Sequence, residues 1–165
     1  MELIEIKGAF DMDYGAPSPI IISNDGELFV SFYINKETDS IEPYKRNIVY
    51  DTGIITLKFK IYLKYMFGIP GNETIEGHPY SKLGMKSYSF YELKKSPLIN
   101  DLKSIEKIHP YFDENKWTKY KHYIITFHDN MFECIAQDYQ IIKEKNMPLY
   151  ILATNILKEL SAKDF

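Results

Sequence analysis

The sequence contains a single cysteine, Cys134, and a single arginine, Arg46. One cysteine excludes an intramolecular disulfide and a cysteine-based zinc site. Arginine forks normally build the bidentate clamps that hold phosphate, carboxylate or guanine, so their near absence argues against phosphoryl transfer and sequence-specific DNA reading. Because the formal net charge is also −3, we expect that nucleic acid is not a partner.

Long apolar runs are missing as well. No stretch approaches the ~20 uninterrupted apolar residues that span a bilayer, and the opening MELIEIK has no apolar segment of signal-peptide length. The sequence also lacks a Gly-rich phosphate loop, a G-x-S-x-G elbow and an H-E-x-x-H helix. We therefore expect a soluble cytoplasmic protein that neither contacts a membrane nor needs a cofactor.

The residues that are present describe an ordinary globular chain. Its 165 residues are enough for one domain with a proper core, and we find no repeat or linker that divides residues 1–165. The hydrophobic content is 45%, and the aromatic residues are mostly Tyr (14) and Phe (10), which favour half-buried strands.

Two strand pairs are expected in the first half. The turn SNDGE separates Ile20-Ile21-Ile22 from the alternating LFVSFYI, which predicts a hairpin near residues 20–34. NIVY, the turn DTG and the segment IITLKFKIYLKYMF predict a second pair near residues 48–65. In that segment Leu57, Phe59, Ile61, Leu63 and Tyr65 alternate with lysines, which indicates one long half-buried strand.

Helices are expected later in the chain. Ser96 as N-cap and Pro97 at the first position predict a short helix near residues 97–108. An apolar stripe from Leu149 to Leu160 predicts an amphipathic C-terminal helix. The expected fold class is α+β, a mostly antiparallel sheet with this helix covering one side.

The segment HYIITFHDNMFEC, from His122 to Cys134, gathers two histidines, two acids and the cysteine. It predicts a hairpin near residues 121–137 that turns at Asp129-Asn130. That turn pairs His128 with Met131 and gives the strands two faces. One face is apolar and consists of Tyr123, Ile125, Phe127, Phe132, Cys134 and Ala136; the other is mixed and consists of His122, Ile124, Thr126, His128, Met131, Glu133, Ile135 and Gln137.

These faces sort the reactive residues. Cys134 lies opposite both histidines, so we expect a buried, inert thiol. His122 and His128 lie about 20 Å apart along an extended strand and are not expected to share a metal. His128 and Glu133 are expected as diagonal neighbours whose side chains meet, with His128 as base and Glu133 as its orienting carboxylate. A structural hydrogen bond at a sheet edge is the alternative.

The other histidines, His78 and His109, both precede proline, which favours extended backbone. Either loop would complete a set of two histidines and one carboxylate if it folded over the mixed face. Such a set is suited to zinc or iron. Any metal is therefore expected on His128, Glu133, and His78 or His109, and an ordinary turn is the alternative for each loop.

Two further ligand-binding candidates are Asp129, in the hairpin turn, and Trp117. The stretch NKWTKYKHY places lysines around Trp117, a pattern that can bind single-stranded nucleic acid. A solvated surface with one anchored tryptophan is the alternative, and the acidic net charge favours it.

A series of motif residues runs through the second half of the sequence: Phe67-Gly68, Pro70, Asn72-Glu73, Gly77-His78-Pro79, Gly84, Tyr88, Phe90, Glu92, Ser96, Leu102, His109-Pro110, His122-Tyr123, Phe127-His128-Asp129, Phe132-Glu133-Cys134 and Ala136. With these residues the sequence resembles a family of uncharacterised bacterial proteins for which no activity is established. The resemblance spans roughly residues 15–140 and departs from the family at Asn130-Met131, where relatives tend to have Ser-Thr. The resemblance points to related proteins and to the His-Pro elements and the FHD hairpin as shared features, but it implies no reaction.

Two functions are compatible with this sequence. The favoured one is a non-catalytic binding or interaction protein of the bacterial cytoplasm, of accessory or immunity type, whose partner the sequence does not identify. The alternative is a small hydrolase or metal-dependent enzyme that uses His128, Glu133 and a His-Pro histidine. Convergence of three of the groups His78, His109, His122, His128 and Glu133 would favour the enzyme.

Overall fold

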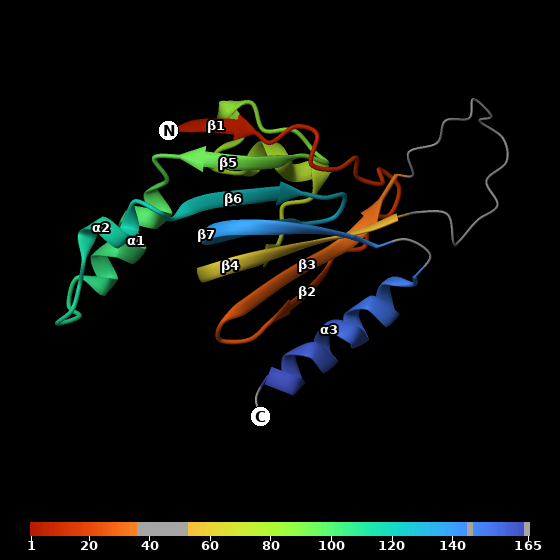
Figure 1. Ribbon diagram of the computed structural model, residues 1–165. Coiled ribbons are helices and arrows are strands. Elements are labelled where there is room, and N and C mark those ends of the chain that lie inside the picture. The colour runs from red at the N-terminus through yellow and green to blue at the C-terminus, as the bar shows by residue number, and fades with distance from the viewer. Residues whose placement is uncertain (36–52, 145–146, 164–165) are drawn as a thin grey trace, which may run out of the picture.

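The computed structural model describes residues 1–35, 53–144 and 147–163. These residues form one antiparallel sheet in the order β1-β5-β6-β7-β4-β3-β2 (Figure 1). The strands are β1 (Glu2–Glu5), β2 (Ile20–Ser23), β3 (Glu27–Ile34), β4 (Gly53–Gly68), β5 (Phe90–Lys94), β6 (Lys121–Thr126) and β7 (Met131–Glu144). The helices are α1 (Pro97–Glu106), α2 (Glu114–Trp117) and α3 (Leu149–Lys163), with 3₁₀ turns η1 (Asn72–Gly77) and η2 (Ser81–Leu83). The predicted α+β class is confirmed.

The sheet curves around an aromatic core on one face. Alternating residues of β3, β4, β6 and β7 point into this core, which the N-terminal segment covers with Phe10 and Met12. Phe32 makes edge contacts with both Phe10 and Phe127, at centroid distances of 5.0 and 5.1 Å. Since a β-strand points alternate side chains to opposite faces, the remaining residues of these strands lie on the other face of the sheet.

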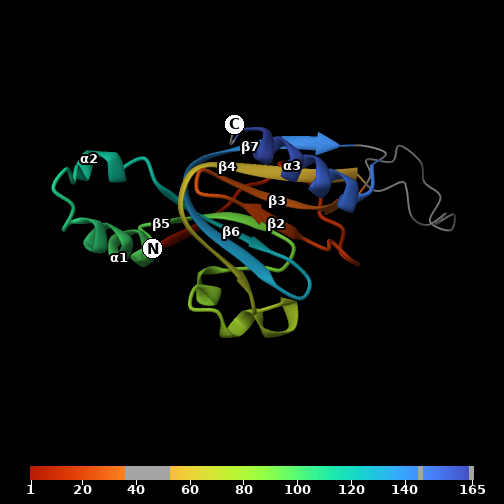
Figure 2. The same cartoon turned by 90° about the horizontal axis from the view of Figure 1, so that it is seen from below.

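Two separate elements cover that outer face (Figure 2). Helix α3 packs Leu149, Leu152, Ile156 and Leu160 against Phe29 and Ile54 at the β2–β3 end. At the other end, the segment with η1 and η2 packs Met85, Ile75 and Tyr80 on β5, β6 and β7. The predicted amphipathic helix is thus confirmed as one of the two covers, although Leu157 of the predicted stripe is exposed.

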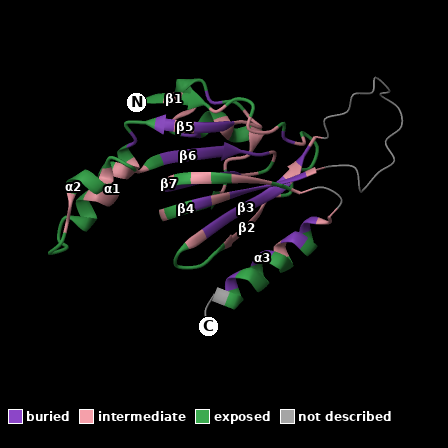
Figure 3. Ribbon diagram, viewed as in Figure 1, coloured by how far each residue is buried: buried purple, intermediate pink, exposed green. Residues whose placement is uncertain are grey.

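Residues 97–120, which include α1 and α2, form an arm that projects beyond one end of the sheet (Figure 1). No residue of this arm is buried, as the green and pink ribbon in Figure 3 shows. The predicted helix near residues 97–108 is confirmed, with Ser96 at the N-cap position and Pro97 first. The Ser96 hydroxyl does not cap the helix, however, because it is bonded to a histidine of β6.

Strand β4 departs from the predicted alternation after Phe59. Its register against β7 shifts between Tyr62 and Lys64, and Ile61 has a left-handed φ of 50°. This bulge turns Tyr62 toward the core and leaves Ile61 and Leu63 exposed, so the prediction of one continuous apolar face was wrong. Residues 48–52 of the predicted second strand pair lie outside the described residues; β4 itself pairs with β3 and β7.

Among the described residues, no helix combines the length and the apolar composition that crossing a membrane requires.

Candidate functional site

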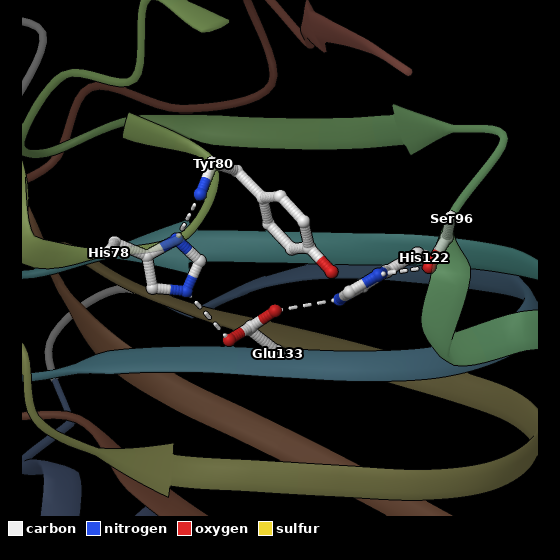
Figure 4. Close-up of polar contacts among 5 residues, drawn as sticks. All are labelled: His78, Tyr80, Ser96, His122 and Glu133. Carbon is white, nitrogen blue, oxygen red and sulfur yellow. Dashed lines mark hydrogen bonds and ion pairs between the residues drawn. The ribbon is translucent and has the colours of Figure 1, made fainter. Parts of the chain in front are cut away.

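Glu133 of β7 lies between two histidines on the outer face of the sheet (Figure 4). Its Oε1 is 3.1 Å from Nε2 of His78, and its Oε2 is 2.8 Å from Nε2 of His122. On the far side of His122, Nδ1 is 2.8 Å from Oγ of Ser96. All four side chains are buried. They form a chain of contacts, His78–Glu133–His122–Ser96, which we call the histidine clasp.

Strand register explains why His122 and Glu133 meet. Their strands pair Ile124 with Glu133 and His122 with Ile135, which makes His122 and Glu133 diagonal neighbours on one face. Ser96 reaches the same face because α1 begins directly after β5, and β5 pairs with β6 at His122. The clasp therefore ties the end of β5 and the start of α1 to the centre of the sheet.

His78 arrives from a distant part of the sequence, at the end of η1. It has the extended backbone that the following Pro79 favours, with φ −68° and ψ 139°. The segment is held to the hairpin by a second contact, in which the backbone N–H of Asn72 donates to the carbonyl of His128 at 2.7 Å. A His-Pro loop reaching Glu133 was one of two alternatives that the sequence left open, and His78 does reach it; the second histidine on Glu133 is His122, not His128.

The hydrogen bonds determine which tautomer the neutral ring of His78 adopts. Its Nδ1 accepts from the backbone N–H of Tyr80 at 3.3 Å, so in the neutral ring the proton lies on Nε2 and points to Glu133. In His122, Nε2–H donates to Glu133, and Nδ1 of the neutral ring accepts from the Ser96 hydroxyl. Every ring nitrogen and both carboxylate oxygens of the clasp therefore have a partner.

Two opposing effects act on the charge of Glu133. Burial raises the pKa of its carboxyl group, but hydrogen bonds and electrostatic attraction from His122 and His78 outweigh burial and lower the pKa to about 2. The carboxylate is consequently ionised in the folded protein at neutral pH. Beside it, burial, together with the charges of Glu133 and Asp101, raises the pKa of the Tyr80 hydroxyl.

The half-buried Tyr80 packs against both imidazoles of the clasp. Its ring contacts His78 edge-on at a centroid distance of 5.2 Å and His122 at 6.0 Å. Figure 4 shows it above Glu133, between the two imidazoles. In the part of the chain that the structure describes, no three His, Cys, Asp or Glu side chains form a group that could hold a metal ion.

His128 and Asp129 do not belong to this cluster. His128 Nδ1 is bonded to Asp129 Oδ1 at 2.8 Å, and the two side chains are 40% and 86% exposed. The predicted His128–Glu133 contact was wrong because Thr126, not His128, pairs with Met131. The connection spans residues 127–130, which shifts the register by two residues and keeps the paired residues of the two strands on their predicted faces.

His109 and Trp117 lie on the arm, remote from the clasp. Both line a pocket of about 230 Å³ that Leu63 of β4 also borders. His109 accepts a hydrogen bond from the backbone N–H of Tyr111, so its His-Pro element forms a local turn. Of the two His-Pro histidines, only His78 reaches the sheet.

Cys134 lies in the core, as predicted. Burial raises the pKa of its thiol well above the ordinary value, with a further contribution from Glu133. The thiol faces away from both histidines of the clasp because neighbouring residues of a strand point to opposite faces.

The sequence interpretation did not assign roles in the site to His122, Ser96 and Tyr80. Had the sequence been read with a four-residue connection, Phe127 to Asn130, it would have predicted the contact of His122 with Glu133. That connection keeps Phe127 in the core and makes His122 the diagonal neighbour of Glu133. Ser96 was interpreted as a helix cap, the usual role of serine before proline at a helix start. No local pattern in the sequence indicates that His78 lies beside Glu133, 55 residues later.

Comparisons of the chain with protein-family models, with curated proteins and with solved structures found no match.

Proposed function

We propose that this protein is a non-catalytic binding protein and that its partner contacts the arm, residues 97–120. The observation that carries the proposal is the exposure of large apolar side chains on this arm: Ile108 is 90% exposed and Tyr111 is 85% exposed. Helical segments without a buried residue gain little from the protein's own core, and clustered exposed apolar groups commonly mark interaction surfaces. An accessory or immunity-type role in the bacterial cytoplasm is part of the same proposal.

The chemistry of the clasp supports a binding protein over an enzyme. A general base or nucleophile needs a hydrogen-bonding position that faces substrate. The ring nitrogens and carboxylate oxygens of the clasp are all engaged with each other or with Ser96 and Tyr80, and the Ser96 side chain is buried. Three of the candidate groups, His78, His122 and Glu133, do converge. Their hydrogen-bonding atoms are used in contacts within the clasp or with Tyr80, and none is left to face a substrate. We infer that the clasp fixes the η1–η2 segment and the base of the arm.

A hydrolase is the second candidate, favoured by one observation. The order Ser96–His122–Glu133, at 2.8 Å for both contacts, is that of a serine, a base and an orienting carboxylate. In that reaction, His122 would take the Ser96 proton while Glu133 stabilised the imidazolium. The hydrolase requires that substrate and water reach Ser96, whereas the binding protein requires that they do not.

A photo-cross-linking experiment tests the binding arm. Placing p-benzoylphenylalanine at Tyr111 should give a discrete protein adduct in extracts of the cells that make this protein, and Ile108→Asp should abolish that adduct. The same probe at Tyr150, a 67% exposed aromatic position on α3, is the matched control and should give none.

Ile108→Asp should change the free energy of unfolding by no more than about 0.5 kcal/mol, because it replaces an exposed side chain. Adducts of equal strength at both probe positions, or an adduct at Tyr111 that Ile108→Asp leaves intact, would contradict the proposal.

A further inference from the structure

The pocket on the arm is lined mainly by aromatic rings. Tyr111 and Phe112 come from the connection after α1, and Trp117 and Tyr120 come from α2 and the residues that follow it. The Trp117 and Tyr120 rings lie 5.5 Å apart at 49°, so they are tilted and do not stack face to face. The face of an aromatic ring carries partial negative charge and attracts cations.

Two carboxylates line the same pocket. Glu106, at the end of α1, has no ion pair with another described residue. Asp113 accepts a hydrogen bond from the backbone N–H of Asn115 through Oδ1, which leaves its second oxygen for another donor. One ammonium group, on Lys116, also lines the pocket. The two carboxylates thus outnumber the one ammonium group among the residues that line the pocket.

We propose that this pocket binds the guanidinium group of an arginine side chain on the partner protein. A guanidinium is a planar cation that stacks on aromatic faces and donates paired hydrogen bonds to carboxylates, which matches rings and carboxylates in one hollow. An anion such as phosphate would meet Glu106 and Asp113, and only Lys116 and His109 would favour it. The identity of the natural ligand rests on the proposed function, because it assigns the arginine to the partner of the arm.

Trp117 is the only tryptophan of the chain, so its fluorescence reports on this pocket alone. At constant ionic strength, N-acetyl-arginine amide should change the Trp117 emission in a saturable way. N-acetyl-citrulline amide, which replaces the guanidinium with a neutral urea of the same shape, should bind about tenfold more weakly or not at all. Equal binding of the two compounds, or saturable binding of inorganic phosphate in their place, would overturn the proposal.

Charge variants give effects of opposite sign. Glu106→Gln should weaken binding of the arginine compound about three- to tenfold, and Lys116→Met should strengthen it by a similar factor. Asp101→Asn removes a carboxylate from α1 outside the pocket lining and should change the affinity less than about twofold. Weaker binding in Lys116→Met would overturn the proposal.

The arginine-binding experiment and the cross-linking experiment test different claims, and either can fail without the other. Binding of arginine without an adduct at Tyr111 supports the pocket and contradicts the partner-binding arm. An adduct at Tyr111 without binding of arginine supports the arm and contradicts the ligand assigned to the pocket.

Discussion

Glu133→Leu should lower the free energy of unfolding by about 4 kcal/mol, the largest effect expected for a single change in the clasp. Leucine removes the acceptor of two buried imidazole N–H groups, on His78 and His122, and offers no replacement. Each unsatisfied buried donor costs about 1–3 kcal/mol. Urea unfolding at pH 7, followed by far-ultraviolet circular dichroism, measures the change.

Glu133→Gln should cost about half as much, roughly 2 kcal/mol, because the clasp can rearrange its protons. The amide oxygen still accepts from Nε2–H of His78, whose tautomer the Tyr80 backbone fixes. The amide nitrogen can donate to His122 once that ring moves its proton to Nδ1 and donates to the Ser96 hydroxyl. The loss of the ionised acceptor remains, since hydrogen bonds to a charged group are stronger.

The cost of Glu133→Gln should also depend on pH. The pKa of Glu133 is lowered to about 2 in the folded protein from 4.5, so its contribution is complete above pH 4.5 and is lost as the pH falls toward 2. The stability difference between wild type and Glu133→Gln should therefore shrink through this window and disappear near pH 2.

Asp129→Asn is the matched control for the clasp. It alters the other histidine–carboxylate contact of the hairpin, which is exposed, and should change stability little at any of these pH values. If the leucine and glutamine variants of Glu133 proved as mild as Asp129→Asn, the clasp would contribute nothing to the fold.

Gly71→Ala should destabilise the protein by about 2–3 kcal/mol through steric overlap. A Cβ at Gly71 would lie 2.7 Å from the carbonyl carbon of Asp129 and 2.8 Å from the carbonyl oxygen of His128. Both are backbone atoms of the hairpin connection, which cannot retreat without disturbing the Asn72 contact beside it. Urea unfolding measures the loss, and hydrogen exchange should show reduced protection across residues 71–89.

Gly77→Ala provides a control within the same segment. No atom lies within 4 Å of a Cβ built at Gly77, and this position lacks a left-handed φ. Its stability should stay within about 0.5 kcal/mol of wild type. A Gly77→Ala cost equal to that of Gly71→Ala would show that the close approach to the hairpin is not what makes glycine necessary at position 71.

The faces of the β6–β7 hairpin were predictable because a period of two survives any register shift of two residues. Phe127, Phe132 and Cys134 accordingly lie in the core as the alternation indicated. The register itself was not predictable from the Asp129-Asn130 turn signal alone. Burial of Phe127 and the four-residue connection moved the pairing, and with it the partner of Glu133 changed from His128 to His122.

The remaining misses involve contacts or backbone changes that no local pattern encodes. The alternation from Leu57 to Tyr65 does not reveal the bulge at Ile61, because a regular strand and a bulged strand are both compatible with this sequence. His78 reaches Glu133 only after the η1–η2 segment has folded over β5, β6 and β7. Pro79 predicted the extended backbone of His78, and tertiary packing decided its neighbour.

If the clasp is a structural cluster, water should not reach its buried groups; if it is an active site, water must reach them. Proton exchange at the imidazole nitrogens, observed by nuclear magnetic resonance on ¹⁵N-labelled protein at neutral pH, distinguishes these two cases most directly. We predict slowly exchanging Nε2–H protons on His78 and His122, with His78 unprotonated at Nδ1, and no such protons on His109, which is exposed, or on the partly exposed His128. Rapid exchange at Nε2 of His122, or a proton on Nδ1 of neutral His78, would contradict the account.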